Sequence, residues 1–182
     1  MEDDAGITHG RASRRFDYRK LYEGGASKAH PASFQRTWLL EVITYWDRER
    51  MLIAGEYPEL VRSARESIKL RAGLKPTTES DRRQQKFGLG TAHWQLGEAL
   101  YRLKDYAGAE AALRQGLEIV KSIPPSFLNQ QIPRSRQRIL LALSVARQGR
   151  LDEARRLVEP ELRWHRDLVA RGSESLEQRF VM

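Results

Sequence analysis

The sequence predicts an all-α protein of about six or seven helices that pair into antiparallel hairpins. From Ala92 to Val120, two apolar segments flank a tight turn at Lys104-Asp105. In the second segment small and apolar residues recur at the spacing 0, 3, 4, 7, 8, 11, which is typical of one helix face. Similar segments flank Gly55 and Gly149. No stretch alternates with period two over enough residues to form a strand.

The segment from Ala92 to Val120 also carries a recognisable motif. The motif residues are Leu96-Gly97, Leu100, Asp105-Tyr106, Ala109 and Gly116. This pattern resembles a tetratricopeptide repeat. Two features depart from the family pattern: His93 stands where the family has tryptophan, and the closing proline comes late, at Pro124-Pro125. The late proline predicts a second helix that is longer than usual.

Two further copies of the pattern are visible. The downstream copy comprises Leu141-Ala142, Val145, Gly149, Ala154, Leu157, Val158 and Leu162. The upstream copy is weaker, because Arg48 stands where the family has a small residue and Leu60 replaces alanine. The three turns lie 49 and 45 residues apart, against about 34 in the family, so we expect long helices or long connections.

The resemblance implies an α-solenoid, because one hairpin cannot bury its apolar face without neighbours. It also implies that the first helix of each hairpin lines a concave, partner-binding face. Transferred to this chain, that face comprises Tyr45, Glu49 and Leu52, then Trp94, Glu98, Tyr101 and Arg102, then Arg136, Ile139, Leu143 and Arg147. An equally strong interpretation makes Trp94, Ile139 and Leu143 core residues between repeats.

The helices can be placed in order along the chain. A first helix over residues 33–54 is capped by Ser33, and its partner over 57–72 is capped by Gly73. A capping box at Thr78–Asp81 starts the next helix, which extends to Leu103 and pairs with residues 106–121. Residues 126–133 form either a loop or the first turns of a helix kinked at Pro133. The remaining segments are a helix over 133–148, a helix over 151–170 that is kinked or restarted at Pro160 and capped by Gly172, and the start of a further or capping helix over 173–182.

Domain boundaries follow from this assignment. Residues 1–31 are expected to be a flexible basic arm or a linker, because glycines interrupt them and apolar residues are few. Within the arm, basic and aromatic residues interleave from Arg14 to Tyr22, as in segments that bind nucleic acid or dock on a neighbour. Residues 32–172 form the helical-repeat domain, with hairpins over about 33–73, 79–121 and 133–171.

Composition excludes several classes of protein. The chain has no cysteine, so disulfides and thiolate metal sites are excluded. It lacks both an apolar run of about 18 residues and a signal peptide, so we expect a cytoplasmic protein without a membrane span. The formal net charge is +8, with bases concentrated at residues 11–36 and 119–151. The simplest interpretation of this excess is a solvated surface.

The sequence shows no catalytic or cofactor-binding pattern, so we expect a protein that is not an enzyme and holds no cofactor or metal. The four histidines are scattered, and Gly88-Leu89-Gly90 lacks the third glycine and the preceding strand of a nucleotide loop. Some members of the resembled family bind chaperone tails through a clamp of lysines and asparagines. Here the clamp positions hold one base, at Arg136, together with Tyr45, Glu49, Gln95 and Leu140.

Three functions remain open. The first is a scaffold that binds a protein or peptide, and the third strip, apolar with a base at each end, suits an acidic amphipathic segment. The second is the sensor or oligomerisation part of a larger bacterial regulator, kinase or cyclase. The third is nucleic-acid binding through the arm and the region from Arg134 to Arg150, which would be strongly salt-dependent.

Overall fold

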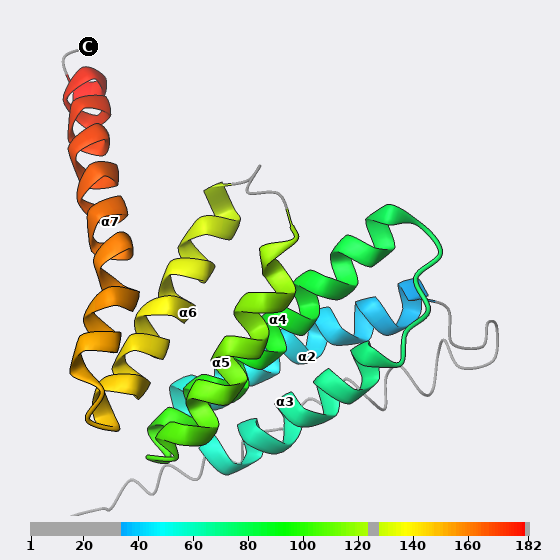
Figure 1. Cartoon of the computed structure of the whole chain (residues 1–182). Coiled ribbons are helices and arrows are strands. Elements are labelled where there is room, and N and C mark those ends of the chain that lie inside the picture. Colours follow the sequence, from blue (N-terminus) through cyan, green and yellow to red (C-terminus); the bar gives the residue numbers. More distant parts are fainter. Residues whose placement is uncertain (1–33, 124–127, 181–182) are drawn as a thin grey trace, which may run out of the picture. The chain divides into compact units, whose positions relative to one another are not determined.

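The computed structural model describes residues 34–123 and 128–180 (Figure 1). Within these ranges the fold is all-α, with six helices and no strand, as the apolar spacing predicts. The predicted arm, including its basic and aromatic piece, and the predicted cap at Ser33 lie outside the described residues. The helices belong to one unit, Phe34–Met182.

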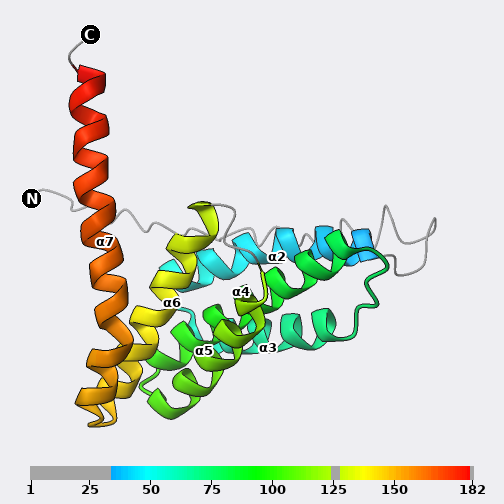
Figure 2. The same ribbon diagram turned by 45° about the horizontal axis from the view of Figure 1, so that its top comes forward.

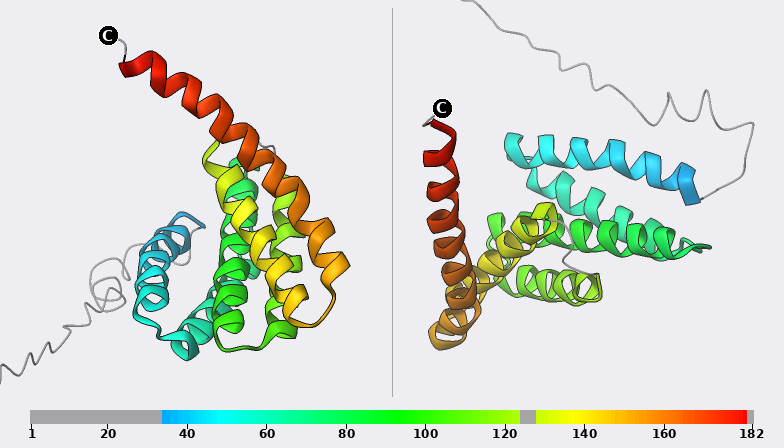
Figure 3. Two further views of the ribbon diagram at one scale, coloured as in Figure 1. Left: turned by 90° about the vertical axis from the view of Figure 1, so that its left-hand side faces the viewer. Right: turned by 90° about the horizontal axis from the view of Figure 1, so that it is seen from above.

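The helices follow one another with short connections. They are α2 (Phe34–Ala54), α3 (Tyr57–Ala72), α4 (Glu79–Arg102), α5 (Tyr106–Lys121), α6 (Leu128–Arg147) and α7 (Leu151–Phe180). Each helix packs on the next, and α4 also contacts α2 and α6. Figures 2 and 3 show the consequence: α2 and α4 lie side by side, and α3 and α5 cover the same side of that pair. Hairpins therefore stack so that their first helices are neighbours.

One turn geometry recurs in all three hairpins. One or two residues after the end of each first helix, a residue has a positive φ: 75° at Gly55, 65° at Lys104 and 83° at Gly149. The next amide then bonds back to the carbonyl five residues earlier, from Glu56 to Met51 (2.9 Å), Asp105 to Leu100 (2.9 Å) and Arg150 to Val145 (3.3 Å). This bond, with a second from the positive-φ residue itself, is the Schellman helix ending. The three hairpins thus share their turn in atomic detail.

The junctions between hairpins are also alike. The Gln85 side chain of α4 donates to the carbonyls of Arg71 (2.7 Å) and Leu74 (3.0 Å), at the end of α3. Forty-nine residues further along, Arg134 of α6 donates to the carbonyls of Val120 (2.9 Å) and Ile123 (2.8 Å), at the end of α5. A helix C-terminus has carbonyls without helical partners, and each junction satisfies them with the next first helix.

Helix starts are fixed by local caps. Thr78 and Asp81 form the predicted capping box, in which each side chain accepts from the backbone amide of the other. Asp105 caps α5 by accepting from the amide of Gly108 at 2.9 Å. Gly73 ends α3 as predicted, although its φ of −78° does not require glycine.

Two buried clusters hold the hairpins together. The first joins α3, α4 and α5 through Leu60, Val61, Ala64, Leu96, Ala99, Leu100, Ala109 and Ala112. The second joins α5, α6 and α7 through Leu113, Leu141, Ala142, Val145 and Ala154. Each cluster lies between consecutive hairpins, so a hairpin buries its apolar face only with a neighbour present.

Small residues allow α4 and α5 to approach closely. A Cβ atom at Gly97 would lie 2.5 Å from Cγ of Leu113 and 3.3 Å from the carbonyl oxygen of Ala109. No real Cβ tolerates the first distance, so a side chain at Gly97 would require Leu113 or the helices themselves to shift. The predicted close approach at this position is confirmed.

The last two helices differ from expectation. Helix α6 begins at Leu128, so residues 128–132 form helical turns rather than a loop, and residues 126 and 127 lie outside the described residues. Helix α7 is continuous from Leu151 to Phe180: it neither restarts at Pro160 nor ends at Gly172, and residues 173–180 continue it rather than begin a separate helix. A glycine inside a helix costs only about 1 kcal/mol relative to alanine. Good helix formers follow Gly172, so that cost does not end the helix.

Candidate functional site

Helix α4 carries three aromatic residues on one face. Phe87, Trp94 and Tyr101 are seven residues apart, so they point in nearly the same direction and lie about 10 Å apart along the axis. Phe87 is 43 % exposed, and Trp94 and Tyr101 are half-buried. The buried residues of α4, including Leu96 and Leu100, belong to its other sides. We call Phe87, Trp94 and Tyr101 the aromatic stripe. The surface that α2, α4 and α6 expose around it is called the even-helix face.

The α2 side of this face is fixed by a buried polar network. Nε of Arg48 donates to Oε1 of Gln95 at 2.6 Å, and Nε2 of Gln95 donates to Oε1 of Glu49 at 2.9 Å. Arg48 and Gln95 are 2 % and 1 % exposed, so the network crosses from α2 to α4 inside the protein. The hydrogen-bond acceptors around Arg48 compensate for the burial of its charge. An arginine can therefore occupy this position, where the resembled family has a small residue.

Tyr45 connects α2 to the charges around it. Burial raises the pKa of Tyr45, and the negative charge of Glu49 and a hydrogen bond to it raise the pKa further. The charges of Arg136 on α6 and Arg48 lower it. Arg136 is thus close enough to influence α2 from the other side of α4, and the three helices share one electrostatic environment.

The α6 side of the face contacts the aromatic stripe directly. A hydrogen bond with Tyr101 raises the pKa of Arg147, and the charge interaction with that tyrosine acts in the same direction. The Tyr101 ring also lies 5.5 Å from the Tyr106 ring and packs on the first core cluster. Glu98, one turn before Arg102, pairs with it at 3.5 Å. Glu98 is therefore neutralised within the face. Arg136, in contrast, makes no ion pair with residues 44–123 or 134–167.

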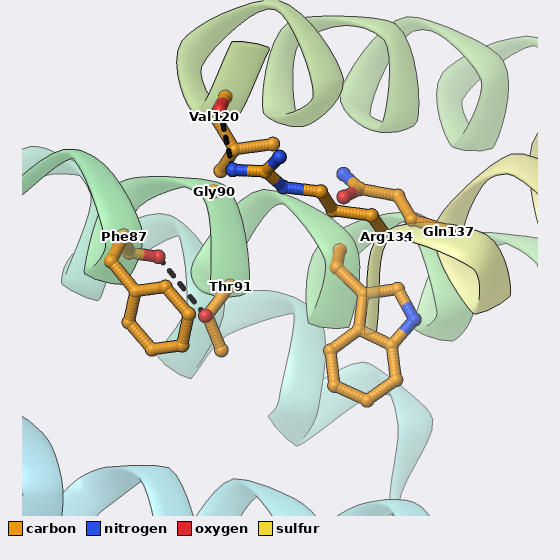
Figure 4. A pocket seen from close by; sticks show the side chains of 7 residues that line it. Phe87, Gly90, Thr91, Val120, Arg134 and Gln137 are labelled. Carbon is orange, nitrogen blue, oxygen red and sulfur yellow. Dashed lines mark hydrogen bonds between the residues drawn. The ribbon is translucent and has the colours of Figure 1, made fainter. Parts of the chain in front are cut away.

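A small cavity lies at the end of the stripe. Phe87, Gly90, Thr91 and Trp94 of α4 line it with Val120, Arg134 and Gln137 (Figure 4). Figure 4 shows the Arg134 side chain extending past the cavity toward the Val120 carbonyl. The volume is about 30 Å³, enough for one or two water molecules. The cavity is part of the floor of the face and is too small to hold a ligand alone.

The predicted site residues fall into two groups. The first group contains the polar and charged side chains, whose interactions are described above: Tyr45, Glu49, Glu98, Tyr101, Arg102, Arg136 and Arg147. The apolar members Trp94, Ile139 and Leu143 differ in burial: Trp94 packs on the second core cluster, Ile139 is half-buried and Leu143 is 46 % exposed. Leu52 packs on the first core cluster. Trp94 was interpreted either as a partner-binding residue or as a core residue. In the structure it contacts the core and also lines the cavity of the face.

The sequence prediction missed one residue of this face and two exposed apolar residues elsewhere on α2. Phe87 extends the aromatic stripe, and its seven-residue spacing from Trp94 could have revealed it. Trp46 and Ile53 of α2 are 68 % and 87 % exposed, and the Trp46 ring lies 5.3 Å from the Tyr45 ring. Both lie one residue after a predicted face position, and no helix precedes α2 in the described part of the chain to cover them.

The arginines between Arg134 and Arg150 do not form one basic surface. Arg134 bonds to the end of α5, and Arg138 pairs with Glu161 of α7 at 2.6 Å. Arg147 contacts α4, and Arg150 pairs with Glu110 of α5 and Glu153 of α7. These side chains face different neighbours, although their sequence positions suggested a single patch.

Comparison with models of known protein families, with curated proteins and with solved structures found no match. The site must therefore be interpreted from its own geometry. In the part of the chain that the structure describes, we find no helix that could span a membrane. Among the described residues, no group of three histidine or acidic side chains could hold a metal ion.

One pair of side chains resembles a catalytic dyad. Oγ of Ser135 lies 2.7 Å from Nε2 of His165, between α6 and α7. Ser135 is 1 % exposed, so a substrate has no access to the hydroxyl. A nucleophile must reach its substrate in addition to contacting its base, and this pair instead joins two helices.

Proposed function

We propose that the helical part of this chain is a tetratricopeptide-like module that binds a protein or peptide on its even-helix face and has no catalytic activity of its own. The observation that carries this proposal is the aromatic stripe of Phe87, Trp94 and Tyr101, half-open on a helix that is flanked on both sides. Tyrosine and tryptophan are the residues that most often dominate binding energy at protein interfaces.

Internal repetition supports the repeat architecture. Three Schellman turns share the same bonds, and two junction caps recur forty-nine residues apart. Each hairpin also depends on its neighbour for burial. In stacks of this kind the first helices are held rigidly side by side, so a partner that binds them does not have to order the surface first.

The charges of the face favour an acidic, amphipathic partner. Glu49 accepts from Gln95, and Glu98 pairs with Arg102, so these carboxylates are already satisfied. Arg136 and Arg147 lie eleven residues apart on α6, about 16 Å along the axis, with Ile139 and Leu143 between them. A segment with apolar residues between two acidic ones would match this strip.

The test is affinity capture followed by a direct binding measurement. The wild-type protein and the Trp94→Ala/Tyr101→Ala double variant are used in parallel on extracts of the source cells, at low and moderate salt. The proposal predicts a protein that the wild type retains and the folded double variant loses. Capture of nucleic acid alone, released as salt rises, would instead favour binding through the basic residues.

A further inference from the structure

The second helices of two hairpins border a groove on a different part of the surface. Its walls are α5 and α7, and residues of α6 also line it. It is lined by Arg114, Leu117, Glu118, Val120, Lys121, Arg134, Arg138, Leu141, Arg156, Leu157, Pro160 and Glu161, and its volume is about 810 Å³. None of the predicted site residues lines it. We call it the α5–α7 groove.

The floor of the groove is apolar. Leu141 and Val120 are buried, and half-buried Leu117 of α5 and Leu157 of α7 pack against the second core cluster. The lining residues of α5 span positions 114–121, which is about two helical turns, or roughly 11 Å. An apolar trough of this length between two helices is the surface that the apolar face of a third helix can occupy.

The rim of the groove has an unbalanced positive charge. Its two carboxylates are already paired, because Glu161 bonds to Arg138 at 2.6 Å and Glu118 lies 3.6 Å from Lys121. Arg114 is neutralised by Glu110 (2.8 Å) and Glu153 (2.5 Å).

Arg134 and Arg156 remain without a carboxylate partner in the part of the chain that the structure describes. Arg134 is half-buried, and burial together with the charge of Arg138 lowers its pKa. A negative charge placed in the groove would relieve this unfavourable environment.

The openness of the groove decides between a small ligand and a helix. Sites for small molecules bury about 70–90 % of the ligand surface. Here the side chains of Lys121 and Glu118 are each 76 % exposed, and Arg156 and Pro160 are also exposed. A small ligand would stay largely in water, whereas an amphipathic helix leaves its polar face in water by nature.

We propose that the α5–α7 groove is a second docking site, which binds a short acidic amphipathic helix of a partner protein. The apolar face of that helix packs on Leu117, Leu141 and Leu157. Its acidic residues lie toward Arg134 and Arg156. The groove shares Val120 and Arg134 with the small cavity of the even-helix face, whereas Arg156, Leu157 and Leu141 line the groove alone.

The experiment selects peptide ligands directly, so the partner protein need not be identified first. Random peptides of about 16 residues, enough for about four helical turns, are displayed and selected against the wild-type protein. Enriched peptides are then synthesised, and their dissociation constants are measured for the wild type and for Arg156→Glu, Arg155→Glu and Tyr101→Ala. Arg155 is a matched control because it is exposed on α7, carries the same charge and does not line the groove.

The proposal predicts enriched peptides with apolar residues three and four apart and acidic residues beside them. Their dissociation constants should rise about threefold to tenfold in Arg156→Glu, in line with a rim charge, and should not change in Arg155→Glu or Tyr101→Ala. No enrichment, or enriched peptides insensitive to Arg156→Glu, would overturn the proposal. Acidic peptides lost only in Tyr101→Ala would also overturn it, because they would bind the even-helix face and support the proposed function instead.

Discussion

The buried guanidinium of Arg48 on α2 donates a hydrogen bond of 2.6 Å to the side-chain oxygen of Gln95 on α4. Gln95 in turn donates to Glu49, so one amide links two side chains of the preceding hairpin. A hydrogen bond to a charged group contributes about 1.5–3 kcal/mol to stability. This link therefore fixes the α2 edge of the even-helix face.

Replacing Gln95 should weaken the connection between α2 and α4 and lower the stability of the fold. Gln95→Met keeps the side-chain volume but removes the acceptor of Arg48, so we expect the free energy of unfolding to fall by about 1.5–3 kcal/mol. Urea denaturation measures the change. Gln84→Met is the matched control, since Gln84 is exposed on the same helix and makes no hydrogen bond within the described residues. Equal stability of the two variants would show that the network carries little energy.

The close approach of α4 and α5 gives a second prediction. Gly97→Ala places a Cβ against Leu113, and we expect a loss of about 1–3 kcal/mol from overpacking. Without the contact, alanine would stabilise a helix interior by about 1 kcal/mol. Gly73→Ala is the control, because a Cβ there meets only carbonyl oxygens at ordinary distances of 3.6 and 3.7 Å. A Gly97→Ala variant that melts above the wild type would contradict the packing described.

The recurrent turns predict opposite effects at equivalent positions. Lys104 adopts a left-handed conformation that glycine holds at Gly55 and Gly149. Lys104→Gly should raise the free energy of unfolding by about 0.5–1 kcal/mol, and Gly149→Lys should lower it by about 1 kcal/mol. Space is not an issue at Gly149, where an added Cβ meets nothing within 4 Å. Changes of the same sign in both variants would mean that the two turns are not equivalent.

Burial of His93 predicts a dependence of stability on pH. The ring is buried on α4, its Nδ1 makes no hydrogen bond within the described residues, and burial lowers its pKa below the ordinary value of about 6.5. The unfolded chain therefore takes up a proton first as the pH falls. Stability should decrease below about pH 6.5 and continue to decrease until the folded histidine also titrates.

The His93→Gln variant isolates this contribution. Urea denaturation of the wild type and the variant at pH 7.5, 6.5 and 5.5 (about one pH unit apart, spanning the ordinary histidine pKa) gives the difference in slope. We expect a shallower decline for the variant, because it lacks the titrating ring. Parallel curves would show that the pKa of His93 does not differ between the folded and unfolded states.

Helix bounds and caps were predicted correctly where they depend on residues that are neighbours in the sequence. The bounds of α3 and α5 follow from the turn at Gly55, the turn at Lys104 and the apolar spacing between them. The capping box at Thr78 and Asp81 is likewise a matter of four neighbouring residues. At Gly172 local reasoning failed, because a terminator residue ends a helix only if the residues beyond it do not continue the pattern.

Long-range relationships were harder to predict. Arg48 departed from the expected pattern in sequence, and its partner Gln95 lies 47 residues away. No local rule connects the two, since each alone is an ordinary polar residue on a helix. The arginines of α6 show the same limit, because Arg134 contacts α5, Arg138 contacts α7 and Arg147 contacts α4. Positions on the even-helix face were predicted by resemblance to a repeat family, and their role in binding stays a prediction.

The most direct test of the central claim is the affinity of a captured partner for the wild type and for two single variants, Trp94→Ala and Tyr101→Ala, by titration calorimetry. If the aromatic stripe is the docking surface, each variant should lose about 1–3 kcal/mol of binding free energy, with its helical content and cooperative unfolding retained. Affinities that match the wild type in both folded variants would contradict the claim and leave the stripe as packing between hairpins.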